Sequence, residues 1–293
     1  MNEPNLSGDN NSTIPTWVKQ DGSRINVVVL GGSHEISAEA EQRTRECIDK
    51  FFNVVDDLAD QPALAIVLGG DGSILHAAKD VSSRQIPVVG VNLGKLGFLA
   101  SISPDQINQA FQDVVDGNCA IVEHLMLRCS VVRDGETIAS TIGLNEAAIV
   151  RGAPFAILDI DLFVDGQLAT TYSCDGLIIS TPVGSTAYNL SAGGPILRKS
   201  LDAFVISPLS PHTLTVRPVV DSADRIMEMQ VHGGAADTAV TVDGQVLVNI
   251  TESDRIQVQR AAETFRMVEV AGQNDYQTLR EKLDWGGRIR HKK

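Results

Sequence analysis

One short run of the sequence combines flexible backbone with an acid. Residues 69–73 read Gly-Gly-Asp-Gly-Ser, and they lie between the apolar run 63–68 and a helical pattern over 73–81. Glycine lets a backbone approach a ligand closely, and the N–H groups at a helix start attract phosphate. Asp71 would repel a phosphate unless it held a metal ion or took a proton from a hydroxyl. This run alone fits a helix-capping turn as well as a catalytic loop, because Gly and Asp are ordinary turn formers.

A second run combines hydroxyls, glycines and a single aromatic ring. Residues 174–197 read CDGLIISTPVGSTAYNLSAGGPIL, in which an apolar strand-like stretch leads into a polar loop. Such a loop can hydrogen-bond many groups on a ligand, and Tyr188 can stack on a base. A solvated surface loop is the alternative, but the flanking apolar residues and the Gly-Pro turn argue against it. We therefore expect this run to line a ligand site.

Two shorter stretches carry weaker signals. The glycine-rich run 90–100 fits a tight packing turn, or one side of a crevice shared with Asp71 at the end of the adjacent strand. The pair Asn145 and Glu146 lies between apolar residues, which fits a strand with one polar pair at its edge. Glu accepts hydrogen bonds from hydroxyls, and Asn both donates and accepts, so the pair also fits recognition of a ribose or a base.

The elements that must position these residues change in character along the chain. Continuous β-branched runs are typical of strands buried in a parallel sheet, and they occur at 25–32, 63–68 and 86–92. Helical patterns follow them at 35–52, 73–81 and 103–115. This alternation predicts a parallel α/β domain over residues 24–120, with ligands at the carboxyl ends of its strands. The polar residues 1–23 are expected to form a disordered tail.

Antiparallel patterns dominate residues 121–270. Alternating runs such as 245–250 are typical of half-exposed strands. Asp-Gly pairs between strand-like runs predict tight hairpins at 134–135, 165–166 and 243–244. We expect a β-rich domain here, followed over 271–293 by a C-terminal helix and tail that pack back on the first domain.

Composition limits the partners and the compartment. The 293 residues are 43% hydrophobic and 21% charged, which suits one large or two ordinary globular domains. A formal net charge of −13 argues against nucleic acid as a partner, because phosphate-rich polymers need a basic face. No apolar run approaches the ~20 residues of a membrane helix, and the first residues lack the features of a signal peptide, so we expect no membrane partner. Four scattered cysteines favour reduced thiols and a cytoplasmic location.

The order of these stretches resembles that in one family, the ATP-dependent NAD kinases of bacterial type. Its motifs occur here in order as GGDGS, the Asn-Glu pair, DGLIISTPVGSTAYNLSAGGPI, PLSPHTLTVRPVV, the second VDGQ and the closing DYQTLREKLDWGG. The resemblance spans roughly residues 63–287, and the 174–197 run is its most specific part. Gly-Gly-Asp-Gly alone is less specific, because lipid kinases and phosphofructokinases resemble it there.

The resemblance implies a fold and a reaction. The fold would be an α/β N-terminal domain with a parallel, phosphofructokinase-like sheet, plus an all-β C-terminal domain. The reaction would phosphorylate the 2′-hydroxyl of the adenosine ribose of NAD to give NADP, with ATP as donor and Mg²⁺ or another divalent metal as cofactor. NAD and ATP are therefore the implied substrates, and a homodimer or homotetramer is the implied assembly.

The resemblance also implies roles for individual residues. Asp71 would be the catalytic group that activates the ribose hydroxyl, directly or by organising the metal. No residue is assigned as a metal ligand. The residues implied to bind the nucleotides are Gly70, Gly72, His76, Asn145, Glu146, Asp175, Thr186, Ala187, Tyr188, Asn189, Leu190, Ser191 and Gln245.

Three positions depart from the family pattern. Val183 stands where many members have Thr, Ser173 replaces a basic residue of some members, and residues 31–34 read GGSH. Two other functions are consistent with parts of the sequence: a Gly-Gly-Asp-Gly kinase acting on a lipid or sugar, and a non-catalytic dinucleotide-binding regulator. The 174–197 run argues against the first. Asp71 argues against the second, because a protein that only binds could lose its acid.

Overall fold

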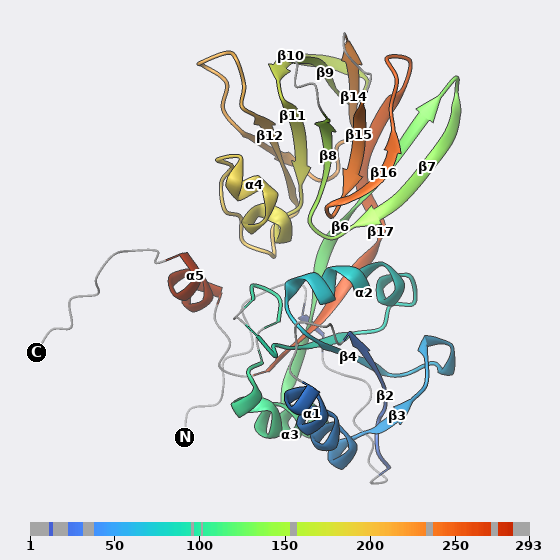
Figure 1. The fold of residues 1–293 in the computed structure, drawn as a ribbon, viewed down its shortest axis with the longest axis vertical. Helices are drawn as coiled ribbons and strands as arrows, with labels where there is room; N and C mark the ends of the chain where they lie inside the picture. The colour runs from blue at the N-terminus through green and yellow to red at the C-terminus, as the bar shows by residue number, and fades with distance from the viewer. Residues whose placement is uncertain are drawn as a thin grey trace, which may run out of the picture. The chain divides into compact units, whose positions relative to one another are not determined.

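The computed structural model describes residues 12–13, 23–31, 38–94, 97–100, 102–152, 157–232, 237–270 and 275–283. The chain forms two compact units (Figure 1). The first contains Met1–Glu123 and Arg266–Lys293, and the second contains His124–Phe265. The chain passes from one unit to the other within two long strands, β6 (Cys119–Arg133) and β17 (Arg255–Val270).

A parallel sheet forms the centre of the first unit. Its strands lie in the order β3 (Asn53–Val55), β2 (Asn26–Gly31), β4 (Leu64–Leu68) and β5 (Val88–Val91). The end of β17 adds a further parallel neighbour, because Met267 pairs with Val88. Every residue of β4 and β5 is buried, which explains why these strands are continuous apolar runs.

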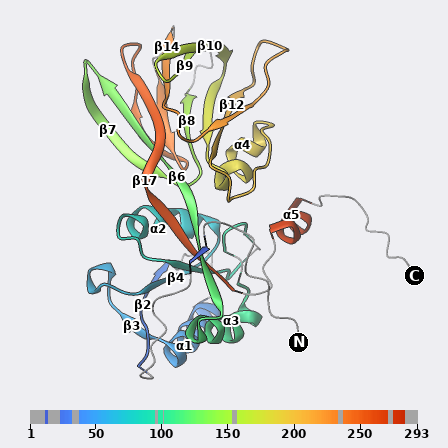
Figure 2. The ribbon, with the colours of Figure 1, turned by 180° about the vertical axis from the view of Figure 1, so that it is seen from behind.

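Helices cover both faces of this sheet. Helices α1 (Ala38–Phe51) and α3 (Ile107–Asp116) lie together on one face, and α2 (Asp71–Ser83) lies on the other, as both views show (Figures 1 and 2). The rings of Phe52 and Phe111 meet edge to face, with their centroids 5.2 Å apart. The short helices η1 (Leu58–Asp60) and η2 (Pro104–Gln106) complete the connections. The predicted parallel α/β arrangement is confirmed.

Antiparallel strands form the second unit. One sheet has the order β13 (Val219–Ser222), β12 (Ala203–Leu209), β11 (Gly176–Ser180), β8 (Glu146–Arg151), β15 (Thr238–Val242) and β16 (Gln245–Asn249). Opposite it lie β10 (Gln167–Cys174), β9 (Leu158–Val164), β14 (Met227–His232) and β17, with β6 and β7 (Glu136–Gly143) beside them. The polar loop after β11 contains η3 (Val183–Thr186) and α4 (Tyr188–Ser191). The predicted β domain is confirmed.

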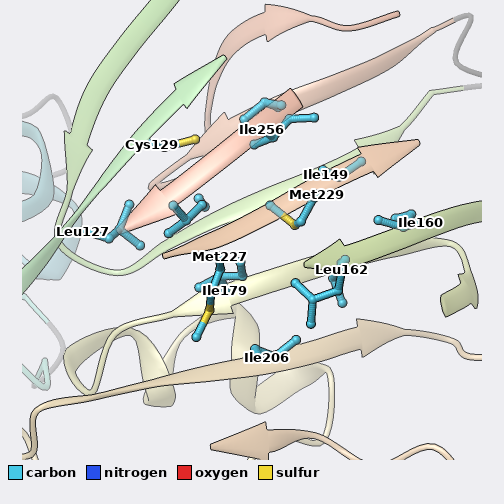
Figure 3. Packing of buried hydrophobic residues seen from close by; sticks show 14 of the residues in the cluster. Leu127, Cys129, Ile149, Ile160, Leu162, Ile179, Ile206, Met227, Met229 and Ile256 are labelled. Atoms are coloured by element: carbon cyan, nitrogen blue, oxygen red, sulfur yellow. The ribbon is translucent and has the colours of Figure 1, made fainter. Parts of the chain in front are cut away.

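The core of the second unit is filled by branched side chains and methionines from its strands. Leu127, Ile149, Ile160, Ile179 and Met229 are all 1% exposed or less and belong to one cluster (Figure 3). All three predicted Asp-Gly turns are present. Each has positive φ at both central residues, as the type I′ hairpin turn requires: 50° and 84°, 51° and 76°, and 50° and 76° along the chain.

The unit boundaries differ from the predicted domain limits. Ser12–Thr13 forms a two-residue strand, β1, paired with β6, although residues 1–23 are predicted to be a disordered tail. The last residues of β17, from Arg266, belong to the first unit and not to the β domain predicted to end at 270, because Met267 pairs there with β5. Helix α5 (Asp275–Leu283) belongs to the first unit.

Two further expectations concern the membrane and the thiols. Within the described ranges, no helix has the length and hydropathy needed to cross a membrane. Cys47, Cys119, Cys129 and Cys174 are buried and carry free thiols. Burial raises the pKa of the Cys129 thiol to about 12, so this side chain behaves as part of the core and not as a nucleophile.

Candidate active site

Asp71 is the first residue of α2 and follows β4 after two glycines. Its carboxylate accepts hydrogen bonds from three successive backbone N–H groups. Phe98 donates to Oδ2 at 2.7 Å, while Leu99 and Ala100 donate to Oδ1 at 2.9 and 3.1 Å. These residues follow β5, the neighbour of β4 in the sheet. The two glycine-rich runs of the sequence therefore meet at this carboxylate.

The backbone holds the Asp71 carboxylate closely without saturating it. A Cβ on Gly97 would overlap Oδ1 of Asp71, so this position has room only for glycine. Among the described residues Oδ1 accepts two of the hydrogen bonds and Oδ2 accepts one. A carboxylate oxygen has two lone pairs, so Oδ2 can accept one further bond. The Asp71 residue is only half-buried, which keeps this capacity open to a ligand.

Three other predicted residues share the start of α2. An added Cβ on Gly70 or on Gly72 would meet no atom within 4 Å, so the space beside both is open. The first N–H groups of a helix have no intrahelical acceptor and carry its positive dipole end. These glycines therefore suit a phosphate. His76 is exposed on α2, one turn further along.

In the second unit, Asp243 holds the Asn-Glu pair. Its carboxylate accepts the N–H groups of Leu144, Asn145 and Glu146 at 2.8, 2.7 and 3.1 Å. Burial raises the pKa of Asp243, and these three donors act in the opposite direction. Asp243 belongs to the second VDGQ run, residues 242–245, in which Gln245 is the predicted nucleotide-binding residue. Gln245 is exposed at the start of β16. Asp243 itself fixes the backbone of Asn145 and Glu146.

Glu146 is an unusual carboxyl group. It is 6% exposed, and its Oε2 has no hydrogen-bond partner among the described residues. Its pKa is raised to about 7, mainly by burial and also by the nearby Asp243, while the backbone N–H of Tyr188, which donates to it, lowers the pKa. A buried acid that titrates near neutrality, with an oxygen left for a ligand, is typical of functional sites.

The hydroxyl-rich loop is locked against the same segment. Thr181 Oγ1 donates to the carbonyl of Leu144 at 2.5 Å, and its N–H donates to the carbonyl of Asn145 at 2.8 Å. A Cβ on Gly184 would overlap the Asn145 carbonyl oxygen. Two motifs that lie some distance apart in sequence therefore form one rigid body, which brings Glu146 next to Tyr188.

The predicted loop residues divide by exposure. Asn189 is fully buried, and its amide spans the loop by donating to the carbonyls of Ser185 and Pro195 at 3.0 and 3.1 Å. Its Oδ1 accepts from the Ser207 hydroxyl at 2.7 Å. This side chain therefore shapes the loop from inside. The predicted residues that remain partly or largely accessible are Asp175, Thr186, Ala187, Tyr188, Leu190 and Ser191.

The departures from the family pattern have local explanations. Val183 is 4% exposed, so the missing hydroxyl would have been inside the loop. The Ser173 hydroxyl donates to Asp159 on the neighbouring strand β9. Of the GGSH stretch, residues 32–34 lie outside the described residues, as do 284–293 of the expected C-terminal tail.

Some site features could not be named from the sequence. The N–H groups of residues 98–100 leave no mark in side-chain chemistry, and only the second glycine of GKLG, Gly97, points to a close approach. Asp243 could be read only as a turn residue, because Asp165 in the first VDGQ copy has the same turn. Among the described residues, no three His, Cys, Asp or Glu side chains gather as a metal site would require.

Comparison with known proteins gives the family. A model of the ATP-NAD kinase N-terminal domain matches residues 11–119, and one of the ATP-NAD kinase C-terminal domain matches 144–270. A protein named NAD kinase from Rhodopirellula baltica is 52% identical over 277 residues, covering 92% of this chain and 89% of that protein. A protein of the same name from Geotalea daltonii is 43% identical, covering 80% and 82%.

Solved structures share the fold. Yeast NADH kinase, crystallised with NADH, superposes with a TM-score of 0.81 at 24% identity, covering 93% of this chain and 91% of that one. An NAD kinase from Archaeoglobus fulgidus, in complex with ATP, gives a TM-score of 0.69 at 24% identity, covering 89% and 98%.

Proposed function

This chain belongs to the ATP-NAD kinase family and is a phosphotransferase, and we propose that it phosphorylates the 2′-hydroxyl of the adenosine ribose of NAD with ATP to give NADP. The observation that carries the proposal is the Asp71 carboxylate, aimed by three backbone N–H groups and left with one free lone pair. Relatives named NAD kinase favour this substrate over a lipid or a sugar.

Asp71 is proposed as the general base. A sugar hydroxyl is a poor nucleophile at neutral pH and gains from a positioned carboxylate. Oδ2 would accept the hydroxyl proton as the ribose oxygen bonds to the γ-phosphorus and the bond to ADP breaks. The N–H groups of Gly70 and Gly72 would bind phosphate oxygens at the start of α2. Most of the remaining catalysis is positioning and charge neutralisation.

Residues of the second unit are proposed to bind the dinucleotide. Glu146 and Asn145 would hydrogen-bond a ribose or base, and the 40% exposed ring of Tyr188 would stack on a base. Asp175, Thr186, Ala187, Ser191 and Gln245 would add further contacts. We propose that Leu190 and Asn189 contribute mainly by shaping the loop, since the Asn189 amide donates twice within the loop and accepts from Ser207 of β12.

A divalent metal, Mg²⁺ or another, is proposed as the cofactor. Mg²⁺ usually binds one or two carboxylates together with substrate phosphates, so the lack of an acidic cluster in the described part of the chain does not conflict with it. Because this proposal uses the free lone pair of Asp71 Oδ2 for the hydroxyl proton, the ion would be held mainly by the substrate phosphates. When bound, the ion would neutralise charge on the transferred phosphoryl group.

A cytoplasmic location and a homodimer or homotetramer complete the proposal. Four buried free thiols fit a reducing compartment. The outer strands β13 and β16 of the six-stranded sheet expose Val219, Val220 and Val246 at 46%, 47% and 68%. Exposed valines on an edge strand favour pairing with another chain. Light scattering would measure this state, and a monomer at all concentrations would contradict it.

The direct test of function is product formation. Purified protein is incubated with NAD, ATP and Mg²⁺, and NADP is measured with an NADP-specific dehydrogenase. We expect NADP to accumulate only when all three are present. Folded protein that makes no NADP with varied phosphate donors and metals would refute the proposal. Parallel reactions with a lipid or a sugar in place of NAD test the competing acceptors.

A further inference from the structure

The C-terminal helix contacts the segment that holds Asp71. Lys282, in the last turn of α5, places its Nζ 4.6 Å from the centroid of the Phe98 ring. This distance lies within the ~6 Å at which an ammonium is attracted to the face of an aromatic ring. Phe98 is also the residue whose N–H donates to Oδ2 of Asp71 at 2.7 Å. Two contacts therefore connect α5 to the candidate catalytic carboxylate.

The Asp71 carboxylate depends on this segment for its orientation. Among the described residues, the three hydrogen bonds that this carboxylate accepts come from residues 98–100, and Gly97 packs against the same carboxylate. Residues 97–100 form no helix or strand of their own. Such a segment takes its conformation from its contacts. A small shift of its backbone would turn the carboxylate away, because a general base must lie within hydrogen-bond reach of its proton.

Phe98 is the part of this segment open to outside contact. Gly97, Leu99 and Ala100 are buried, whereas Phe98 is only partly buried. Its ring is the surface on which Lys282 lies. Arg280 is the other basic residue in the last turn of this helix. The contact of the Lys282 cation with the ring therefore connects α5 to the segment that holds Asp71.

We propose that Lys282 is a positioning residue for the kinase reaction: its ammonium fixes the Phe98 ring, and through it the three N–H groups that aim Asp71. The inference rests on the proposed function of Asp71 as the base. It assigns a catalytic purpose to the C-terminal helix, which lies far from the Gly-Gly-Asp-Gly run in sequence. Lys282 itself does not touch the reacting atoms.

The first test compares kinetics of matched variants. Lys282→Ala should lower kcat about two- to fivefold, which is the effect of losing an exposed cation on an aromatic ring, and should leave the KM for ATP unchanged. Lys282→Arg should restore kcat, because a guanidinium also stacks on an aromatic face. Arg280→Ala removes the same charge two residues away, about 200° around the helix, and should leave kcat at the wild-type level.

The second test does not depend on activity. Amide hydrogen exchange at Phe98, Leu99 and Ala100 should be about two- to fivefold faster in Lys282→Ala than in the wild type and Arg280→Ala. In a Phe98→Leu background, Lys282→Ala should change neither exchange nor kcat, because the ring that it acts on is gone. The double variant therefore separates a specific contact from general loosening of α5.

The outcomes distinguish this inference from the function on which it rests. Slower turnover and faster exchange in Lys282→Ala, with rescue by Lys282→Arg, would support it. Unchanged exchange at residues 98–100 would overturn it, and so would an equal loss of kcat in Arg280→Ala. If the wild type made no NADP, the proposed function would fall, and the exchange rates would still decide whether Lys282 holds the segment.

Discussion

Replacing Glu146 with Gln should make the second unit less sensitive to pH. The pKa of this carboxyl rises from an ordinary value of 4.5 to about 7 on folding, mainly through burial. The folded state therefore binds the proton more tightly than the unfolded chain does. Stability from this group is present below pH 4.5 and is lost as the pH rises through 7, because the ionised carboxylate is disfavoured where it is buried.

The size of this effect follows from the two pKa values. Each pH unit between them corresponds to about 1.4 kcal/mol, so wild type should lose about 2–3 kcal/mol relative to Glu146→Gln between pH 5 and pH 8.5. Gln has nearly the same shape, and its amide oxygen can still accept the N–H of Tyr188. Every other titrating group is shared by the two proteins, so their difference isolates Glu146.

Urea unfolding at several pH values measures this difference. The transition of the second unit is followed separately, because two units need not unfold together. We expect the two stability curves to diverge steadily between pH 5 and about pH 7.5 and to run parallel above it. Curves that stay parallel from pH 5 to pH 8.5 would refute the assignment of a raised pKa to Glu146.

Three further tests, two of them with a control substitution, examine the geometry of the site. Asp243→Asn should lower the free energy of unfolding by about 1–3 kcal/mol and raise the KM for NAD, because an N–H group of the Asn-Glu segment loses its acceptor. Asp165→Asn, in the matching exposed turn, should have a clearly smaller effect on the free energy of unfolding and leave the KM for NAD unchanged. Denaturant unfolding and enzyme kinetics check both variants. Gly97→Ala should lower kcat at least tenfold, because the added Cβ displaces the candidate catalytic carboxylate. Gly94→Ala is the control: its added Cβ meets only one atom within 4 Å, at 4.0 Å, so its kcat should equal that of the wild type. Tyr188→Ala should weaken NAD binding by about ten- to a hundredfold in calorimetry, and unchanged affinity would exclude stacking.

The sequence predicts the elements and the motifs better than their contacts. Continuous apolar runs identify β4 and β5 because both faces of these strands are buried. Asp-Gly pairs identify the hairpins, since few other residues adopt positive φ readily. The unit boundaries are harder to place, because β6 and β17 run through them without a turn or a change in composition.

Contacts between distant backbone groups account for most of what sequence could not reveal. Asp71 and Asp243 each accept three successive N–H groups, and donors of this kind are invisible in a list of side chains. In the sequence, Asn189 is one more polar residue of a binding loop, yet its amide nitrogen donates both of its hydrogen bonds to carbonyls of that loop. The contact of Lys282 with Phe98 joins two segments that no local pattern relates.

The central claim is that the Asp71 carboxylate takes the proton of the ribose hydroxyl. Its most direct test measures the rate of NADP formation and the affinity for NAD in Asp71→Asn. Asn keeps the shape of the side chain and an oxygen that can still accept the N–H groups of Leu99 and Ala100. We predict that kcat falls at least a hundredfold while NAD affinity stays within about threefold of wild type. Turnover close to that of wild type, in a variant that folds and binds NAD, would contradict the account.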